Sequence, residues 1–179
     1  MTNSTQTVKL NPDLELRLTQ AGTGRPALVL HGGAGPASVG GLAAHLAESM
    51  QAITPTHPGF DGTARPSSLA SVAELAQAYL QYLSDAGLRD VLVVGSSVGG
   101  WIGAEMALQD SRRLISGLIL LDAGGIAVDE APSPNVFALE PARIFEAAFY
   151  DPAKFAPNPS SMTPERNALQ RSNMATLPC

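Results

Sequence analysis

Cysteine and basic residues are scarce in this chain of 179 residues, and each shortage excludes a class of protein. The single cysteine, Cys179, cannot form a disulfide within the chain, so no disulfide framework is expected. Eleven Lys and Arg against 16 Asp and Glu give a formal net charge of -5, and the absence of any basic run argues against binding to nucleic-acid phosphates. No apolar run is suited to a signal peptide or a membrane span. We therefore expect a cytoplasmic protein with no nucleic-acid or membrane partner.

Glycine is absent from the last 54 residues, which divides the composition in two. All 17 glycines lie at or before Gly125, whereas eight of the 14 prolines and four of the five phenylalanines follow it. Glycine-rich turns between short apolar runs are typical of an α/β core, and a proline-punctuated segment without glycine is typical of separate helices. We predict a core over residues 1–126 and a helical cap over residues 127–179.

Short apolar runs in the first part predict a sheet whose strands alternate with helices. Alternating polarity predicts a strand with one polar face at 13–19. Apolar runs predict further strands at 27–31, 52–54, 91–94 and 117–122. Apolar residues at helical spacing predict helices at 39–50, 72–83 and 98–109. The order β-β-β-α-β-α-β-α-β indicates an α/β fold, in which a mostly parallel sheet carries flanking helices.

Local signals mark the ends of several helices. Ser71 and Glu74 form a capping-box pattern at the start of the second helix, and Gly87 is suited to a left-handed cap at its end. The second part of the chain contains two helical patterns, at 140–150 and at 163–177, the latter beginning with the dipeptide Thr-Pro.

The stretch Gly95-Ser96-Ser97-Val98-Gly99 matches the pattern G-x-S-x-G between a predicted strand and a predicted helix. In that context the pattern is typical of a sharp, strained turn that holds a nucleophilic serine at the start of a helix. The spacing selects Ser97 as the nucleophile, because Gly95 and Gly99 lie two positions before and after it. The corresponding positions around Ser96 are Val94 and Val98. The alternative is a glycine-rich turn with incidental serines.

A second glycine loop, His31 to Pro36, follows the predicted strand 27–31. Glycines there allow the backbone to approach a substrate oxygen closely. We predict an oxyanion hole formed by the backbone amides of Gly33 and Val98, with Ala34 as the alternative to Gly33. The loop lacks the last glycine of a dinucleotide-binding fingerprint and the lysine of a phosphate-binding loop.

Four segments in this order and spacing, "LVLHGGAG", "THPGFDGTARP", "LRDVLVVGSSVGGWIGAEMAL" and "LILLDAGG", resemble the α/β-hydrolase fold. The likeness covers residues 10–125, belongs to the serine-hydrolase, esterase-like branch, and implies no metal or organic cofactor. The resemblance also implies a helical cap after the sixth strand. It further implies an acid and then a histidine after the nucleophile.

No histidine follows Ser97 in this sequence, so the base of such a triad is missing. We expect His45 to be a solvated surface residue, and His31 and His57 to support loops. Asp122, after the predicted strand 117–122, is a candidate acid or site-lining residue. The expectation is a chain truncated before the last two strands, whose strand 117–122 is an apolar edge open to self-association.

The function expected from these features is hydrolysis of a small, fairly apolar ester or related acyl substrate, with little turnover in this chain because it lacks a base. We expect Phe137, Phe145 and Phe149 to line the substrate pocket or to pack the cap. Two alternatives stay open. One is a non-catalytic small-molecule binding or signalling module, and the other is a hydrolase that breaks C–C bonds of dienoic acids.

Overall fold

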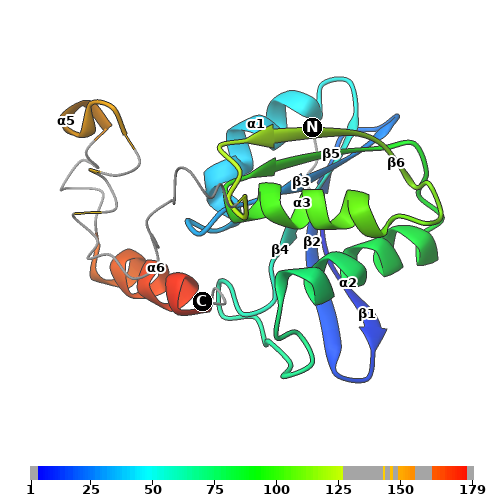
Figure 1. Cartoon of the computed structure of the whole chain (residues 1–179), viewed down its shortest axis with the longest axis horizontal. Helices are drawn as coiled ribbons and strands as arrows, with labels where there is room; N and C mark the ends of the chain where they lie inside the picture. Colours follow the sequence, from blue (N-terminus) through cyan, green and yellow to red (C-terminus); the bar gives the residue numbers. More distant parts are fainter. Residues whose placement is uncertain (1–3, 127–142, 144–145, 147–148, 156–162, 177–179) are drawn as a thin grey trace.

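A six-stranded sheet is the framework of the computed structural model, which describes residues 4–126, 143, 146, 149–155 and 163–176 (Figure 1). The strand order is β1-β2-β4-β3-β5-β6. The bounds of the strands are β1 Ser4–Asn11, β2 Leu14–Ala21, β3 Pro26–Leu30, β4 Gln51–Thr56, β5 Val91–Ser96 and β6 Ile115–Leu121. Strands β4, β3, β5 and β6 run parallel, while β1 and β2 are antiparallel to their neighbours. The predicted α/β architecture and its element order are therefore confirmed.

The helices cover the two faces of this sheet (Figure 1). Helices α2 (Val72–Asp85) and α3 (Val98–Gln109) lie side by side on one face. The other face carries α1 (Gly40–Leu46), which follows a 3-10 turn at Pro36–Val39 and packs near β4. Parallel strands need such crossovers, and helices on both faces bury the sheet.

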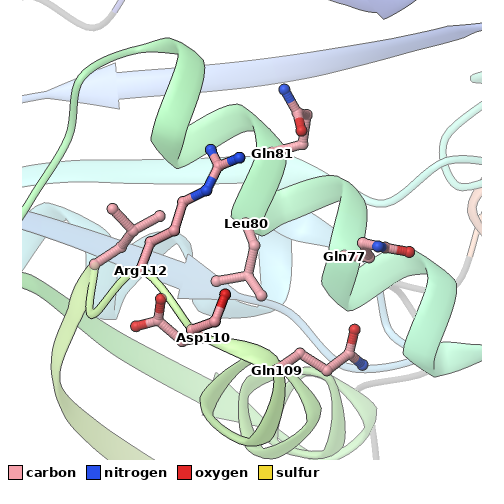
Figure 2. A pocket seen from close by; sticks show the side chains of 8 residues that line it. Gln77, Leu80, Gln81, Gln109, Asp110 and Arg112 are labelled. Carbon is pink, nitrogen blue, oxygen red and sulfur yellow. The ribbon is translucent and has the colours of Figure 1, made fainter.

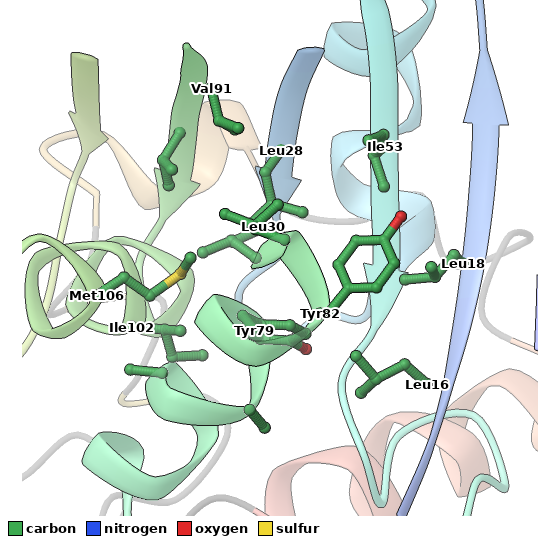
Figure 3. Close-up of a cluster of buried hydrophobic side chains, with 14 of the residues drawn as sticks. Leu16, Leu18, Leu28, Leu30, Ile53, Tyr79, Tyr82, Val91, Ile102 and Met106 are labelled. Carbon is green, nitrogen blue, oxygen red and sulfur yellow. The ribbon is translucent and has the colours of Figure 1, made fainter. Parts of the chain in front are cut away.

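The main hydrophobic core lies between the sheet and the pair α2 and α3 (Figure 3). Tyr79 of α2 is fully buried among Leu28 and Leu30 of β3, with Ile102 and Met106 of α3 beside them. Alternate residues of β2 point into the same core, as the period of two in its sequence predicts. Those residues are Leu14, Leu16 and Leu18.

Helix α2 has both of the ends that its sequence predicts. The Ser71 hydroxyl accepts a hydrogen bond from the amide of Glu74 (3.2 Å), and the Glu74 carboxylate accepts one from the amide of Ser71 (2.8 Å). At the other end, Gly87 has a φ of 66°, and the amide of Leu88 donates to the carbonyl of Leu83 at 2.9 Å. These are the capping box and the glycine cap that satisfy the free backbone groups of a helix.

The predicted helix 39–50 is wrong at its end, because α1 stops at Leu46. The chain then turns, and the amide of Met50 donates to the carbonyl of Leu46 before β4 begins at Gln51. Gly22 packs against this turn so closely that a Cβ atom on it would lie 2.2 Å from the Met50 carbonyl oxygen. The apolar stripe that suggested a longer helix continues into the turn, where Ala47 is buried.

The predicted order begins with a strand for which the sequence pattern marks no residues, and β1 is that strand. Its sequence is mostly polar and mostly exposed, and only Val8 and Leu10 pack against the core. It exists because it pairs with β2 from Ser4 to Asn11. Such pairing depends on a partner strand rather than on a local apolar pattern.

The second part of the chain contributes two described helices, α5 (Pro152–Phe155) and α6 (Pro164–Thr176). The predicted helix 163–177 is thereby confirmed. Of the predicted helix 140–150, only Arg143 and Glu146 are described as helical, and most of its other residues lie outside the described ones. The boundary at residue 126 and the role of residues 127–179 as a cap stay predictions. Among the described residues, no helix is both long and apolar enough to cross a membrane.

Strand β6 forms an apolar edge of the described sheet, since β5 is its only partner there. Ile119, Leu120 and Leu121 are each 39–44% exposed. We expect this edge to pair with a second copy of the chain, because exposed strand edges offer free backbone donors and acceptors. Leu120→Lys is expected to reduce dimer formation measured by analytical ultracentrifugation over a concentration series.

The matched control is Leu108→Lys, which removes an apolar side chain that is 83% exposed on helix α3 rather than on the edge strand. This control is expected to leave the association unchanged. A wild-type chain that stays monomeric at every concentration would refute pairing through β6.

Candidate active site

Ser97 joins β5 to α3 in a backbone conformation that residues other than glycine rarely adopt, with φ of 54° and ψ of -121°. Its amide donates a hydrogen bond to the carbonyl of Leu121 at 2.9 Å. Its own carbonyl accepts from the amides of Gly100 (2.9 Å), Trp101 (3.2 Å) and Gly124 (3.2 Å). A strained residue persists only where its surroundings fix it, and strained residues cluster at functional sites. The neighbouring strand and the new helix supply that restraint here.

The two glycines that frame Ser97 are required by close backbone contacts. A Cβ atom on Gly95 would lie 2.3 Å from the carbonyl oxygen of Gly99. A Cβ atom on Gly99 would lie 2.4 Å from the carbonyl oxygen of Leu30, at the end of β3. Both distances are far below van der Waals contact, so the G-x-S-x-G pattern is what allows α3 to start so near the sheet.

We expect Gly99→Ala to lower the free energy of unfolding by about 1–3 kcal/mol, because the added methyl group must displace the end of β3. Chemical denaturation monitored by circular dichroism measures the change. The control is Gly41→Ala in α1, where the added Cβ would meet no atom within 4 Å apart from the neighbouring backbone of its own helix. There the substitution should be neutral or stabilising. Equal effects of the two substitutions would contradict the close approach at Gly99.

The Ser97 hydroxyl does not cap the helix that it begins. At this position a serine oxygen usually accepts a hydrogen bond from an amide of the first helical turn. The Ser97 hydroxyl accepts no such bond, and the residue is half-buried. The first amides of a helix have no acceptor within it and carry a partial positive charge. The amide of Val98, the first residue of α3, therefore lies beside Ser97 in a position suited to stabilising negative charge.

The glycine loop after β3 lies against Ser97. A Cβ atom on Gly32 would be 3.0 Å from the Ser97 Cβ and 3.6 Å from its hydroxyl oxygen. The loop is a tight turn in which the amide of Gly35 donates to the carbonyl of Gly32 at 3.1 Å. Gly33 and Ala34 form its tip, and Gly33 is half-buried while Ala34 is exposed. The structure thus brings Ser97, Val98 and this loop together, and the oxyanion role of the amides stays a prediction.

Two buried histidines, His31 and His57, support the glycine loop through hydrogen bonds to backbone groups. The His57 amide donates to His31 Nε2 at 3.0 Å, so the proton of the His31 ring is on Nδ1, which donates to the carbonyl of Gly32 at 2.7 Å. His57 Nε2 donates to the carbonyl of His31 at 2.9 Å, and the Tyr79 hydroxyl donates to His57 Nδ1 at 2.5 Å. The two rings lie 3.8 Å apart. Both histidines therefore support loops, as expected.

This network leaves neither ring a free lone pair to accept the proton of Ser97. Burial lowers the pKa of His31 to about 4, against the opposing effects of its hydrogen bond to Gly32 and the charge of Asp61. Burial and then the neighbouring His31 lower the pKa of His57 well below its usual 6.5. The third histidine, His45, is a surface residue that is 79% exposed beside Glu48. None of the three is placed as the base of a serine nucleophile.

The lowered histidine pKa values predict acid sensitivity. The unfolded chain binds protons on these rings near pH 6.5, whereas folded His31 binds one only near pH 4. The free energy of unfolding should therefore fall as the pH drops from 6.5 to 4, by about 3 kcal/mol for His31 alone. Urea denaturation at several pH values measures this loss.

The variant His57→Gln should flatten the pH dependence, because it removes one of the two buried rings. His45→Gln, at an exposed position, is the control and should reproduce the wild-type curve. A stability that does not change between pH 6.5 and 4 would contradict the neutral, buried state of the pair.

Asp122 follows β6 with a φ of 45°, and its carboxylate accepts a hydrogen bond from the Ser96 hydroxyl at 3.2 Å. It is exposed and lies beside the residue that precedes Ser97. This contact places Asp122 beside the turn of Ser97. The partner of the carboxylate in this contact is the Ser96 hydroxyl and not a histidine. Its role as acid stays a prediction.

The phenylalanines predicted to line the pocket are only partly described. Phe137 and Phe145 lie outside the described residues, and Phe149 is 37% exposed. An apolar cavity of about 30 Å³ is instead formed next to the start of α3 by Val98, Ile102 and Phe60, with Thr176 of α6 among its walls. Thr176 lies in none of the four segments that carry the resemblance, whereas Phe60 lies in one of them, "THPGFDGTARP", although nothing there marks it as lining a cavity.

A larger recess of about 170 Å³ lies between α2 and the loop that follows α3 (Figure 2). Asp110 borders it, and one carboxylate oxygen accepts from the amide of Ile115 at 2.8 Å while the other, buried, has no partner among the described residues. This loop leads into the start of β6, whereas Ser97 follows the end of β5. In a parallel sheet the starts and the ends of the strands lie on opposite sides of the molecule. The recess lies at the amino ends of the strands and Ser97 at their carboxyl ends, so the recess is separate from the serine site.

Comparison with known proteins places this geometry in a family. A model described as "Alpha/beta hydrolase family" matches residues 27–178. An uncharacterised protein of Mycobacterium tuberculosis strain H37Rv is 34% identical over 110 residues, which are 61% of this chain and 32% of the relative. An uncharacterised protein of Mycobacterium bovis matches with the same values. The aligned part thus spans about a third of the length of these relatives.

Solved structures share the fold at low sequence identity. A serine hydrolase from the polyaromatic-hydrocarbon-degrading bacterium Cycloclasticus zankles has a TM-score of 0.75 at 19% identity, with 99% of this chain and 68% of that chain covered. A bacterial membrane phospholipase A has a TM-score of 0.71 at 22% identity, with coverage of 97% and 58%. An epoxide hydrolase has a TM-score of 0.69 at 19% identity, with coverage of 97% and 72%.

Proposed function

Because the chain belongs to the alpha/beta hydrolase family, we propose that it is a serine hydrolase for a small, fairly apolar ester or related acyl compound. The observation that carries this proposal is the conformation of Ser97. A strained serine lies at the start of α3, with its hydroxyl not used as a cap and with a glycine loop against it. A turn with an incidental serine has no need of this strain.

The proposed reaction begins with attack of the Ser97 hydroxyl oxygen on the substrate carbonyl carbon. The carbonyl π electrons move to the oxygen, and the amides of Val98 and Gly33, or Ala34, stabilise that negative charge. The hydroxyl proton passes to a base. Collapse of the tetrahedral intermediate expels the alcohol with a proton and leaves an acyl group on Ser97, which water then hydrolyses.

The base is the part of this reaction that the three histidines do not supply. His31 and His57 use their lone pairs within the buried network, and His45 is on the surface. A serine hydrolase without its base loses most of its rate, and the oxyanion hole and substrate binding retain only a small part. We therefore propose that this chain alone turns over acyl substrates slowly, if at all.

An experiment with added imidazole separates the nucleophile from the missing base. We expect a fluorophosphonate probe to label Ser97 slowly, and free imidazole to accelerate the labelling by about tenfold or more, because it can take the serine proton. Intact-mass spectrometry and peptide mapping measure the labelled fraction and its site.

Ser97→Ala should abolish the labelling, and Ser96→Ala is the matched control that should retain it. Rapid labelling without imidazole would contradict the absence of a base in this chain. No labelling of Ser97 even with imidazole would contradict its role as nucleophile.

A non-catalytic small-molecule binding module is the second candidate. The occupied lone pairs of His31 and His57 favour it, because they leave Ser97 without a base. Calorimetric binding of a short ester that is recovered unchanged, together with unlabelled Ser97, would support this function over hydrolysis.

A further inference from the structure

Helix α6 contacts the loop after β4 through one buried amide. Asn173 is 2% exposed, although it lies on a helix whose other described side chains are mostly exposed. Its Oδ1 accepts a hydrogen bond from the amide of Asp61, and its Nδ2 donates to the Asp61 carboxylate, each at 2.9 Å. Two hydrogen bonds between a buried side chain and one distant residue fix the helix in position and orientation.

Asp61 is itself in a left-handed conformation, with a φ of 48°. Asn173 holds its amide and its carboxylate, and the guanidinium of Arg17 on β2 donates to its carbonyl at 3.2 Å. All the polar groups of this strained residue are thus held from outside its own loop. Without Asn173, two of the three contacts are lost.

The glycine loop beside Ser97 meets the same point. Gly35 has a φ of 84°, and a Cβ atom on it would lie 3.0 Å from Asn173 Nδ2 and 3.3 Å from the Asp61 carboxylate. The loop therefore packs directly on the Asn173–Asp61 pair, and a Cβ atom at Gly35 would fit only if that pair shifted slightly. Because the amide of Gly35 closes the turn onto Gly32, a shift of Gly35 also moves Gly33, which lies between them.

A second contact lies one turn further along α6. The Thr176 hydroxyl shares its one proton between the carbonyls of Gly59 (3.1 Å) and Ser172 (3.0 Å), and the Arg65 guanidinium donates to the carbonyl of Thr176. Gly59 has a φ of 90°, and a Cβ atom on it would lie 2.3 Å from the Thr176 methyl group. Residues three apart lie on one face of a helix. One face of α6 thus packs on two glycines, in two separate loops.

From these contacts we infer that Asn173 is a positioning residue, which seats α6 and thereby holds the glycine loop at the distance from Ser97 that an oxyanion hole needs. The significance for catalysis rests on the proposed function, since it takes the Gly33 amide as an oxyanion donor. The coupling between α6 and the loop does not rest on it. With α6 unseated, Gly35 and Asp61 lose their common partner, and the tip of the turn that carries Gly33 is held only by the support that the buried histidines give at Gly32.

The variant Asn173→Asp tests this coupling with almost no change of shape. At pH 8 it places a carboxylate against the Asp61 carboxylate and removes the donor between them. Amide hydrogen exchange should then become at least about tenfold faster in α6, at Asp61 and at Gly33 to Gly35, while β5 keeps its protection.

The double variant Asn173→Asp with Asp61→Asn exchanges the two side chains. It restores one donor facing one carboxylate, so it should return the exchange rates to near the wild-type values. Ser172→Ala, at the exposed position next to Asn173, is the control that should leave all the rates unchanged.

Two outcomes of the exchange measurement would overturn the inference. One is wild-type exchange at Gly33 to Gly35 in Asn173→Asp even though α6 itself exchanges faster, which would show a structural role confined to the helix. The other is failure of Asp61→Asn to restore protection in the double variant.

The rate of fluorophosphonate labelling at Ser97, measured with imidazole on the same four proteins, connects the coupling to the proposed chemistry. We expect it to fall about tenfold in Asn173→Asp and to recover in the double variant. If Ser97 is not labelled in the wild type, the proposed function fails, and the exchange rates still decide whether Asn173 positions the loop. If Ser97 is labelled equally in all four proteins, the positioning role fails and the nucleophile stands.

Discussion

The close approach of α3 to the end of β3 is the constraint on which the rest of the site depends. The helix starts so near the sheet that no side chain fits at Gly99 against the carbonyl of Leu30, or at Gly95 against Gly99. The turn between β5 and α3 must then be sharp, and it is Ser97 that takes the unfavourable backbone angles. The same approach brings the residues after β3 against Ser97. A strained serine, a free helix start and a glycine loop are therefore consequences of one packing contact.

That contact requires the loop after β3 to be held rigidly, and the buried histidines supply the support. Their ring nitrogens satisfy backbone groups of both loops, at Gly32 and at His57 and His31 themselves. Buried polar groups are stabilising only when they are paired, so each ring must stay neutral and keep its tautomer. The chemistry that makes these histidines good supports also removes them as bases. Their role in the site is to position the loop.

Much of the fold and the strained turn at Ser97 could be predicted from the sequence, because both depend on local patterns, whereas the catalytic role of Ser97 stays a prediction. Alternating polarity predicts the strand at 13–19, continuous apolar runs predict the strands from 27–31 onward, and the glycines at 95 and 99 mark the sharp turn at Ser97. The predicted end of α1 is four residues too late, because the apolar stripe continues into a turn that packs against Gly22, a contact with a residue far away in the sequence. Strand β1 had no assigned residues for a related reason, since its order comes from pairing with β2.

The contacts of α6 show the limit of sequence reasoning most clearly. Asn173 lies in a polar helix and Asp61 in the loop after β4, and no motif relates one to the other. What could have signalled the contact is the pair of glycines that α6 packs against, Gly35 and Gly59, yet in the sequence they are two glycines among 17. A glycine kept for a distant helix and a glycine kept for a tight turn look the same in one sequence. Only the structure shows that Gly35 serves both purposes, and so links the position of α6 to the loop beside Ser97.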